Sequence, residues 1–443
     1  MSLAPLPAAA ATQKTSAPKN AVPKSVDLTL SEIPAKVFIN PTGELAKGRP
    51  YQGTASSVVT ASGKRLFVAW FGNGVDENLD NYIMVAFGDS TLKNFSNVRM
   101  VICSPHVGKV RCFDPAVWRD PSGRVWISWA QSTGIITFGR FFDRWSRRGS
   151  TWVIYTDNPD DENPSWSEPR RMFEGVMINK PAFLKNGEIL YCVSVTRNHL
   201  VNDLHTPEEG LWIYRSRDGG LAFEKLNYIR LPENATEAMI VEKKDGTLWF
   251  LGRVDPNTLN LRYDAKTRDY IPTNVPTDGI YEAFSKDEGK TFTQAIPSKI
   301  PHPGSRFHIA RLKSGNLLLL KHYANDERWL ADKPKARLGE GYKPLNHNPR
   351  HRKDIIAWIS PDDGKPLQGG LVLDYSTNVN YPDASQSDQG DIYISWDRAR
   401  HIEAAILAAK ITEADIIAKK IITPGSLTGI MVNSGRDSKN PIK

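Results

Sequence analysis

Long apolar runs, clustered charge and long amphipathic helical patterns are all scarce in this 443-residue chain. No stretch of about eighteen apolar residues occurs, so we expect no transmembrane helix and no membrane partner. Lys and Arg outnumber Asp and Glu by 57 to 49, but they are scattered along the chain. This scatter argues against a nucleic-acid partner. The lack of helical periodicity favours an all-β fold.

Cysteine is limited to Cys103, Cys112 and Cys192. Three cysteines exclude a disulfide framework, and their spacing matches no zinc motif. A bridge between Cys103 and Cys112 across a loop stays open. We expect no metal and no cofactor.

Repetition is what the chain has in abundance. Six segments consist of a turn glycine followed by a short β-rich run, and their glycines are Gly63, Gly123, Gly187, Gly246, Gly315 and Gly390. Each is interpreted as a two-residue hairpin turn that leads into a half-buried strand, where glycine takes the positive φ that the turn requires. Spacings of about sixty to seventy-five residues suit four-stranded blades. The sequence therefore predicts an all-β, six-bladed β-propeller.

A second repeat has the form Ser-x-Asp-x-Gly-x-x-aromatic. It occurs as SRDGGLAF (216–223) and SKDEGKTF (285–292), and in degraded form as SPDDGKPL (360–367). Its aspartates, Asp218, Asp287 and Asp362, each precede a turn glycine by 28 residues, so both repeats belong to one unit. We expect Asp and Ser to cap backbone N–H groups of a tight hairpin while the aromatic side chain packs between blades.

The chain divides into a low-complexity leader (1–35), a single propeller (36–430) and a tail (431–443). The leader is rich in Ala, Pro and Ser and lacks the features of an intact signal peptide. The location is left open, with a secreted or periplasmic protein favoured. A capping-box start at Thr412 predicts a short C-terminal helix over 411–421.

Polar residues recur where the innermost strand of each blade begins. The six candidates, one per blade, are Gln52, Asp114, Lys180, Glu237, Arg306 and Tyr381. Ionisable groups of both signs that converge in one concavity are suited to acid/base chemistry and anion recognition. Arg253 and Arg398 are placed to return toward the same mouth of the channel.

These repeats resemble the sialidase (neuraminidase) superfamily over most of residues 50–410. The resemblance implies a Tyr nucleophile activated by a Glu, an Asp acid/base, and Arg residues that clamp the carboxylate of the sugar. The segment TEAMIVEKKDGTLWFLGR gives Glu237 and Arg253 two of these roles, and Tyr381 resembles the nucleophile. Arg306 is the candidate for the third Arg. Asp76 and Asp80 are the candidates for the acid, with Asp80 preferred.

The chain departs from the family at the first Arg, where Gln52 stands. A neutral amide cannot form a charged bidentate clamp. Lys180, Arg398 or Arg49 are the candidates to restore the charge; otherwise the acidic sugar is not ordinary sialic acid. The resemblance thus implies a sialidase-like glycoside hydrolase with an acidic carbohydrate as its partner.

Two alternatives stay open. One is a propeller-type polysaccharide lyase that acts on uronic acids and uses a histidine with a Tyr and an Arg; the histidines considered are His106, His205, His308 and His347. The other is a non-catalytic glycan-binding propeller, because a fold never guarantees chemistry. The arginine-rich loop from Gly134 to Ser150 either covers the mouth or is a solvated insert.

Overall fold

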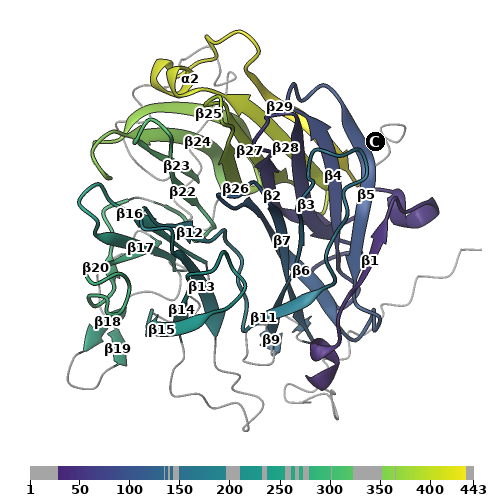
Figure 1. Cartoon of the computed structure of the whole chain (residues 1–443), viewed down its shortest axis with the longest axis horizontal. Helices are drawn as coiled ribbons and strands as arrows, with labels where there is room; N and C mark the ends of the chain where they lie inside the picture. Colours follow the sequence, from purple (N-terminus) through teal and green to yellow (C-terminus); the bar gives the residue numbers. More distant parts are fainter. Residues whose placement is uncertain are drawn as a thin grey trace, which may run out of the picture.

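The computed structural model describes residues 28–133, 135–137, 140–142, 149–195, 210–231, 237–254, 261–264, 269–272, 279–300, 302–322, 352–364 and 366–435. Six antiparallel sheets follow one another around a common centre, from blue on the right of Figure 1 through teal to yellow at the top. The predicted six-bladed β-propeller is confirmed.

The first three blades carry the N-terminal half of the chain. Blade 1 consists of β2 (Gln52–Val59), β3 (Arg65–Gly72), β4 (Tyr82–Asp89) and β5 (Phe95–Cys103), with β1 (Lys36–Ile39) added at its outer edge. Blade 2 consists of β6 (Arg111–Arg119), β7 (Val125–Ser132), β10 (Ser150–Thr156) and β11 (Arg170–Glu174). Blade 3 consists of β12 (Ala182–Phe183), β13 (Ile189–Val195), β14 (Gly210–Ser216) and β15 (Glu224–Ile229).

The other three blades complete the ring. Blade 4 consists of β16 (Ala238–Glu242), β17 (Leu248–Arg253), β20 (Ile280–Ser285) and β21 (Ile296–Pro297). Blade 5 consists of β22 (His308–Arg311), β23 (Leu317–His322), β24 (Lys353–Ser360) and β25 (Gln368–Thr377). Blade 6 consists of β26 (Val379–Gln386), β27 (Ile392–Arg398), β28 (Ala405–Ile411) and β29 (Leu427–Ser434), so the last sheet runs beyond residue 430.

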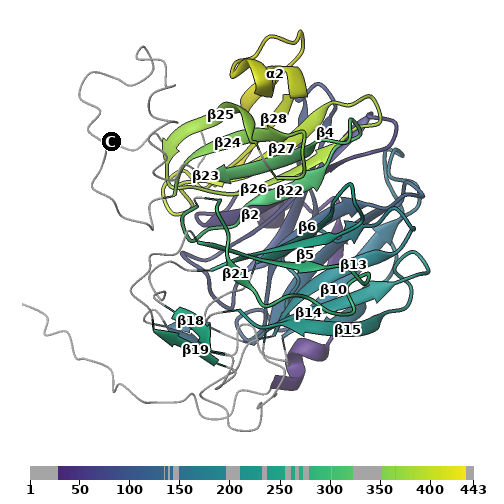
Figure 2. The ribbon, with the colours of Figure 1, turned by 90° about the vertical axis from the view of Figure 1, so that its left-hand side faces the viewer.

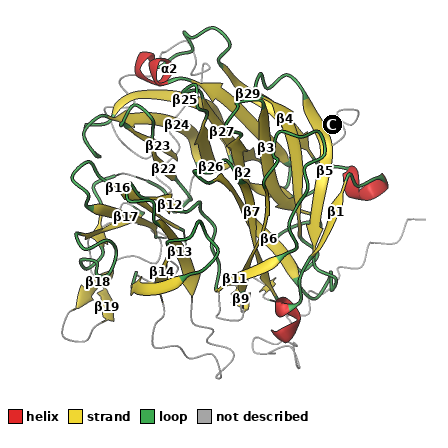
Figure 3. Ribbon diagram, viewed as in Figure 1, coloured by secondary structure: helices red, strands yellow, loops and turns green. Residues whose placement is uncertain are grey.

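Few elements lie outside the blades, and strands dominate Figure 3. Two separate hairpins are formed by β8 (Ile135–Thr137) with β9 (Arg140–Phe142), and by β18 (Leu261–Asp264) with β19 (Asp269–Pro272). The second hairpin lies at the lower left in Figure 2. The 3-10 helices are η1 (Leu28–Glu32) and η2 (Gly43–Ala46). The expected C-terminal helix is α2 (Glu413–Ala418), which starts at Thr412 with the predicted capping box.

Apolar side chains fill the spaces between neighbouring blades. Blades 1 and 2, for example, share a cluster that contains Phe67 and Ile127. The ring closes in the same way, because Trp70 of blade 1 and Ile406 of blade 6 belong to one cluster. Closure thus rests on packing between the first and last blades. A separate apolar cluster of this kind lies between each pair of neighbouring blades.

The Ser-x-Asp repeats form the expected capped turns. In the second copy, Asp287 Oδ1 accepts hydrogen bonds from Ser285 Oγ (2.8 Å) and Thr291 N (2.9 Å). Asp218 bonds Ser216 Oγ (2.8 Å) and Ala222 N (2.9 Å) in the same pattern. In the degraded copy, Pro366 occupies the equivalent of Ala222 and Thr291, and proline has no N–H to donate. The repeat is therefore structural, as predicted.

The three cysteines are free thiols, so the Cys103–Cys112 bridge left open by the sequence is not formed. Burial raises the pKa of Cys112 and Cys192, which keeps both protonated at neutral pH. Among the described residues, no helix has the length and apolar character needed to cross a membrane.

Candidate active site

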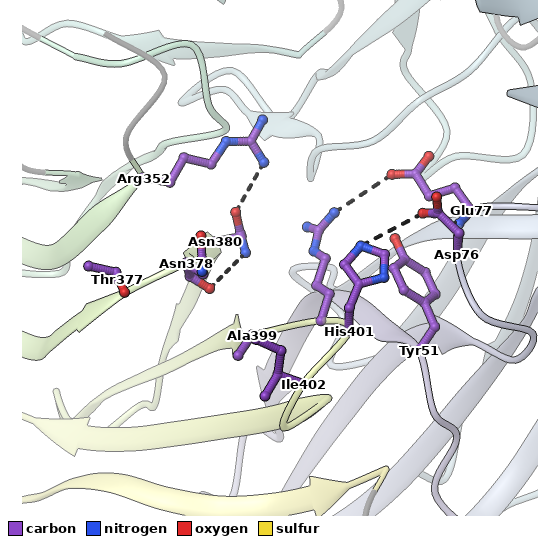
Figure 4. Close-up of a pocket in the computed structure, with 11 residues that line it drawn as sticks. Tyr51, Asp76, Glu77, Arg352, Thr377, Asn378, Asn380, Ala399, His401 and Ile402 are labelled. Atoms are coloured by element: carbon purple, nitrogen blue, oxygen red, sulfur yellow. Dashed lines mark hydrogen bonds and ion pairs between the residues drawn. The ribbon is translucent and has the colours of Figure 1, made fainter. Parts of the chain in front are cut away.

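A pocket of about 470 Å³ opens at the end of the channel where the innermost strands begin (Figure 4). Its walls come from the residue before β2, the loop between β3 and β4, the residue before β24, the end of β25, the start of β26 and the turn after β27. The lining residues are Tyr51, Asp76, Glu77, Arg352, Thr377, Asn378, Asn380, Ala399, Arg400, His401 and Ile402. Three blades therefore contribute to one polar pocket.

Tyr381 lies beside this pocket because of a β-bulge. The pairing of β26 with β27 shifts register between Asn380 and Asp383, and Tyr381 has a φ of 51°. A bulge with a positive φ re-aims a side chain, and for a bulky residue that backbone is strained. The same bulge occurs in β2 at Thr54 (φ 55°) and in β6 at Asp114 (φ 49°). The bulge is thus a repeated device of this propeller.

The Tyr381 hydroxyl is joined to Glu237 through a guanidinium. Arg253 Nη1 donates to the hydroxyl oxygen of Tyr381 (3.1 Å) and to Glu237 Oε1 (2.6 Å). Burial would raise the pKa of Glu237, but Arg253, Arg352 and Tyr381 together outweigh this effect and the net pKa is lowered. Burial and then the Glu237 charge raise the pKa of Tyr381, and nearby arginines oppose them. At neutral pH the pair is therefore a carboxylate beside a neutral phenol.

Three more arginines surround the Tyr381 ring. The Cζ atoms lie 4.4 Å (Arg400), 5.2 Å (Arg352) and 5.9 Å (Arg306) from the ring centroid. Arg352 donates to Asn380 Oδ1 and to the carbonyl oxygen of Gly304, both at 3.1 Å. Burial lowers the pKa of Arg352, and the Arg253 and Arg400 charges lower it further. Cations gathered around a phenol also reduce the cost of its ionisation.

The loop between β3 and β4 brings Asp76 and Glu77 to the pocket. Asp76 Oδ1 lies 3.8 Å from His401 Nε2, and Glu77 Oε1 lies 3.7 Å from Arg400 Nη1. Asp80, the preferred acid, is exposed and is not among the described residues that line the pocket. Both aspartates are exposed, and of the two Asp76 alone lines the pocket.

Gln52 does not face the pocket. It is fully buried, and its Oε1 accepts hydrogen bonds from Trp70 Nε1 (2.9 Å) and Arg49 N (3.2 Å). Its Nε2 donates to the carbonyl oxygen of Ala404 (2.7 Å). The alignment of Gln52 with Tyr381 is wrong by two residues, because the bulge of β2 lies at Thr54. Gln52 is therefore a structural residue.

Lys180 and Arg306 converge on a carboxylate inside the channel. Asp383 Oδ2 lies 2.9 Å from Lys180 Nζ, and its Oδ1 lies 3.3 Å from Arg306 Nη2 and 3.0 Å from His308 Nδ1. Lys180 and His308 also line a second pocket, of about 350 Å³, at the far ends of the inner strands. These cations neutralise Asp383, and neither Lys180 nor Arg306 lines the first pocket.

The other sequence-derived candidates also lie outside the lining of the first pocket. Arg398 pairs with Asp374 (3.3 Å) and Glu403 (2.8 Å). Arg49 donates to the hydroxyl of Tyr82. Asp114 is buried at the bulge of β6.

Two of the four histidines considered for the lyase, and part of the arginine-rich loop, are among the described residues. His106 and His308 do not line the first pocket. His205, His347, Gly134 and residues 138–139 and 143–148 lie outside the described residues. No group of three His, Cys, Asp or Glu side chains in the described part of the chain is arranged to hold a metal ion.

Sequence reasoning missed Arg352, Arg400, Glu77 and His401. One signal was available for the inner strands: Thr54, Asp114, Glu237, Arg306 and Tyr381 each lie nine residues before a turn glycine. That constant offset separates Thr54 from Gln52. Arg352 has a weaker signal, since it directly precedes the strand that leads into the third Ser-x-Asp repeat. Arg400 and His401 lie in a turn with no repeat pattern.

Comparisons with known proteins agree with this architecture. The model of the BNR repeat-like domain family matches residues 64–394. The structure is similar to those of an intramolecular trans-sialidase from Ruminococcus gnavus in complex with oseltamivir carboxylate (TM-score 0.56, 11% identity, covering 88% of this chain and 99% of that one) and a Hadza microbial sialidase (TM-score 0.56, 17% identity, 83% and 66%). It is also similar to a protein of unknown function from Dyadobacter fermentans (TM-score 0.53, 16% identity, 82% and 94%).

No curated protein matches the chain. At 11–17% identity, the likeness to these solved structures shows the fold alone.

Proposed function

We propose, from the premise that the chain belongs to the BNR repeat-like domain family, that it is a retaining glycosidase that removes a carboxylated sugar from a glycan. The observation that carries the proposal is the hydrogen-bonded series Tyr381–Arg253–Glu237. This series lies beside the pocket that is lined by Arg352 and Arg400. Sialidases among the structures of similar fold are consistent with it.

The first step is attack by Tyr381 on the anomeric carbon. The phenol proton moves to Glu237 as the oxygen–carbon bond forms, because a neutral phenol is a poor nucleophile without a base. The bond from the anomeric carbon to the leaving oxygen breaks, and Asp76 donates a proton to that oxygen. We assign this role to Asp76 instead of Asp80 because Asp76 lines the pocket.

The second step releases the sugar. Asp76, now ionised, takes a proton from a water molecule that attacks the anomeric carbon, and the Tyr381 oxygen leaves and recovers its proton from Glu237. Two displacements retain the anomeric configuration. A tyrosine nucleophile suits a sugar with a carboxylate next to the reacting carbon, because a second carboxylate would repel it. Arg253 and Arg352 would bind that carboxylate.

The substitution Tyr381→Phe tests this mechanism. It removes only the nucleophilic oxygen, so kcat for release of the acidic sugar should fall at least about a thousandfold. Tyr393→Phe is the matched control, because that hydroxyl donates to the carbonyl oxygen of Ser90 (2.9 Å) away from the pocket. A fully active Tyr381→Phe variant would contradict the assignment.

One set of acidic glycans distinguishes the hydrolase from the two alternatives, a polysaccharide lyase and a glycan-binding propeller. The purified protein is incubated with sialosides, other ulosonic-acid glycosides and uronic-acid polysaccharides, while reducing ends and ultraviolet absorbance are followed together. Reducing ends without absorbance support the hydrolase. A new absorbance indicates the double bond of a lyase product, and binding without any product indicates a glycan-binding module.

A further inference from the structure

Strand β2 brings no cation to the pocket, since its sequence QGTASSVV contains neither Lys nor Arg. We propose that Arg400, in the turn after β27, supplies from the last blade the carboxylate-binding cation that the first blade lacks, and that Gln52 and Gly53 position it. The inference rests on the proposed function, because it assumes an acidic sugar in this pocket. It identifies Arg400 as the group that selects for the carboxylate.

The guanidinium of Arg400 is held at the pocket by two carboxylates. Its Nε and Nη2 bond both oxygens of Asp397 (2.8 and 2.9 Å), and Nη1 lies 3.7 Å from Glu77 Oε1. The Asp397 carboxylate in turn accepts from Thr54 N (2.8 Å) and Asn380 Nδ2 (2.9 Å). A bidentate pair with a firmly bonded partner fixes the plane of a guanidinium. Arg400 is therefore oriented before any ligand binds.

Gln52 fastens the turn that carries Arg400. Its backbone N–H donates to the carbonyl oxygen of Arg400 (3.4 Å), and its side chain donates to that of Ala404 (2.7 Å). The other side-chain atom, Oε1, is occupied by Trp70 and Arg49. Gln52 is thus a positioning residue that joins blade 1 to the turn of blade 6.

Gly53 leaves the space through which Arg400 passes. A Cβ atom at this position would lie 2.6 Å from Arg400 Nε and 2.9 Å from its Cδ. Gly53 does not have a positive φ, so a larger residue is excluded by the arginine and not by the backbone. The absence of a side chain at Gly53 and the presence of Arg400 are therefore linked.

The balance of charge makes the site suited to one carboxylate. Arg253 is paired with Glu237 and Arg400 with Asp397, whereas Glu77 is shared between Arg400 (3.7 Å) and the buried Arg111 (3.5 Å). Arg352 forms no ion pair with a carboxylate in the part of the chain that the structure describes. A single carboxylate bound by Arg253 and Arg352, with Arg400 as the added third cation, would supply the anion that Arg352 lacks.

The test compares an acidic sugar with its uncharged analogue. Dissociation constants of sialic acid, glucuronic acid and the carboxamide of each are measured by calorimetry for the wild type, Arg400→Gln and Gly53→Ala. Each substitution should weaken binding of the preferred acid by about 10- to 100-fold, as expected for loss of a charge-assisted bond, and leave its carboxamide within about twofold. Arg119→Gln, which removes one positive charge at the far mouth, is the control for net charge.

The double variant Arg400→Gln/Gly53→Ala should bind the acid no more weakly than Arg400→Gln, because Gly53→Ala acts through Arg400. Equal losses for acid and carboxamide, or no loss with Arg400→Gln, would overturn the inference. Hydrolysis is assayed separately. Binding of the acid without cleavage contradicts the proposed function and leaves the inference on Arg400 intact. Cleavage without a preference for the carboxylate supports the proposed function and contradicts the inference. Absence of any binding contradicts both.

Discussion

At the scale of single residues, the environment of Tyr381 decides how its proton must move. Burial and the Glu237 charge raise the pKa of the phenol, and Arg253, Arg352 and Arg400 reduce this effect without cancelling it. The pKa of Glu237 is lowered in spite of its burial, because Arg253 stabilises the carboxylate. The phenol is therefore neutral and the base is charged at neutral pH. In the proposed mechanism, proton transfer to Glu237 therefore accompanies attack on the sugar.

The choice between the two candidates for the acid is testable with one pair of variants. Asp76→Asn should lower kcat by about 10²- to 10⁴-fold on an alkyl glycoside, whose leaving oxygen needs a proton, and less on an aryl glycoside. Asp80→Asn is the matched control in the same loop and should stay near the wild-type rate. If Asp80→Asn shows the loss and Asp76→Asn does not, Asp80 is the acid.

At the scale of elements, the blades combine two local devices with opposite consequences. The capped Ser-x-Asp turns satisfy backbone N–H groups and stabilise the hairpins. The bulges at Thr54, Asp114 and Tyr381 place non-glycine residues at positive φ, which costs free energy. In β26 the strained bulge directs the Tyr381 side chain toward the pocket. The turns are therefore expected to govern stability, and the bulge of β26 to govern activity.

The substitution Asp287→Ala tests the contribution of a capped turn. It leaves Thr291 N and the hydroxyls of Ser285 and Thr291 without their acceptor, so the free energy of unfolding should fall by about 1 kcal/mol. Lys290→Ala, an exposed change in the same turn, should have an effect within about 0.5 kcal/mol. Denaturant unfolding measures both, and kcat should be unchanged. Equal stability of the two variants would show that the cap contributes little.

At the scale of the whole molecule, the inside of the ring contains ionisable groups that remain in one protonation state. Asp383 stays ionised among Lys180, Arg306 and His308. The ring centroids of two further buried histidines, His302 and His322, lie 5.5 Å apart, and Ser305 is hydrogen-bonded to both. Burial and then neighbouring cations lower the pKa of both histidines, to about 3 for His322. Both therefore stay neutral in the folded protein.

The stability of the propeller should consequently fall as the pH decreases below about 6.5. The unfolded chain binds protons at these histidines near their ordinary pKa of about 6.5, whereas the folded chain does not, so protonation favours unfolding. Each histidine should cost up to about 1.4 kcal/mol per pH unit between pH 6.5 and 5, where carboxylates remain largely ionised in both states. Thermal denaturation at pH 7.5, 6.5 and 5.5 measures the effect. The variant His302→Gln/His322→Gln should show a shallower dependence of Tm on pH, and an unchanged slope would contradict this account.

Local patterns in the sequence were sufficient to predict the fold. The turn glycines and the Ser-x-Asp repeats report conformations fixed within a few residues, so the six blades and the structural role of the repeats could be predicted. The same periodicity located Tyr381 and Glu237 at the start of inner strands, and the segment that contains Glu237 located Arg253. The periodicity did not place Gln52 correctly relative to Tyr381. The β-bulge of β2 changes which residues face the pocket, and the alternation of polar and apolar residues does not reveal a bulge.

The tertiary structure alone decided which charges meet. Arg352 comes from blade 5, whereas Arg400 and Tyr381 come from blade 6, so the approach of Arg352 to the Tyr381 ring depends on how blade 5 packs against blade 6. Whether Lys180 and Arg306 face a ligand or neutralise Asp383 depends on the position of that carboxylate inside the ring. Charge pairing is a long-range property of the folded chain, and the space above Gly53 exists only once β2 lies against the turn of blade 6. The sequence by itself therefore determined the repeating unit, and the closure of the ring determined the site.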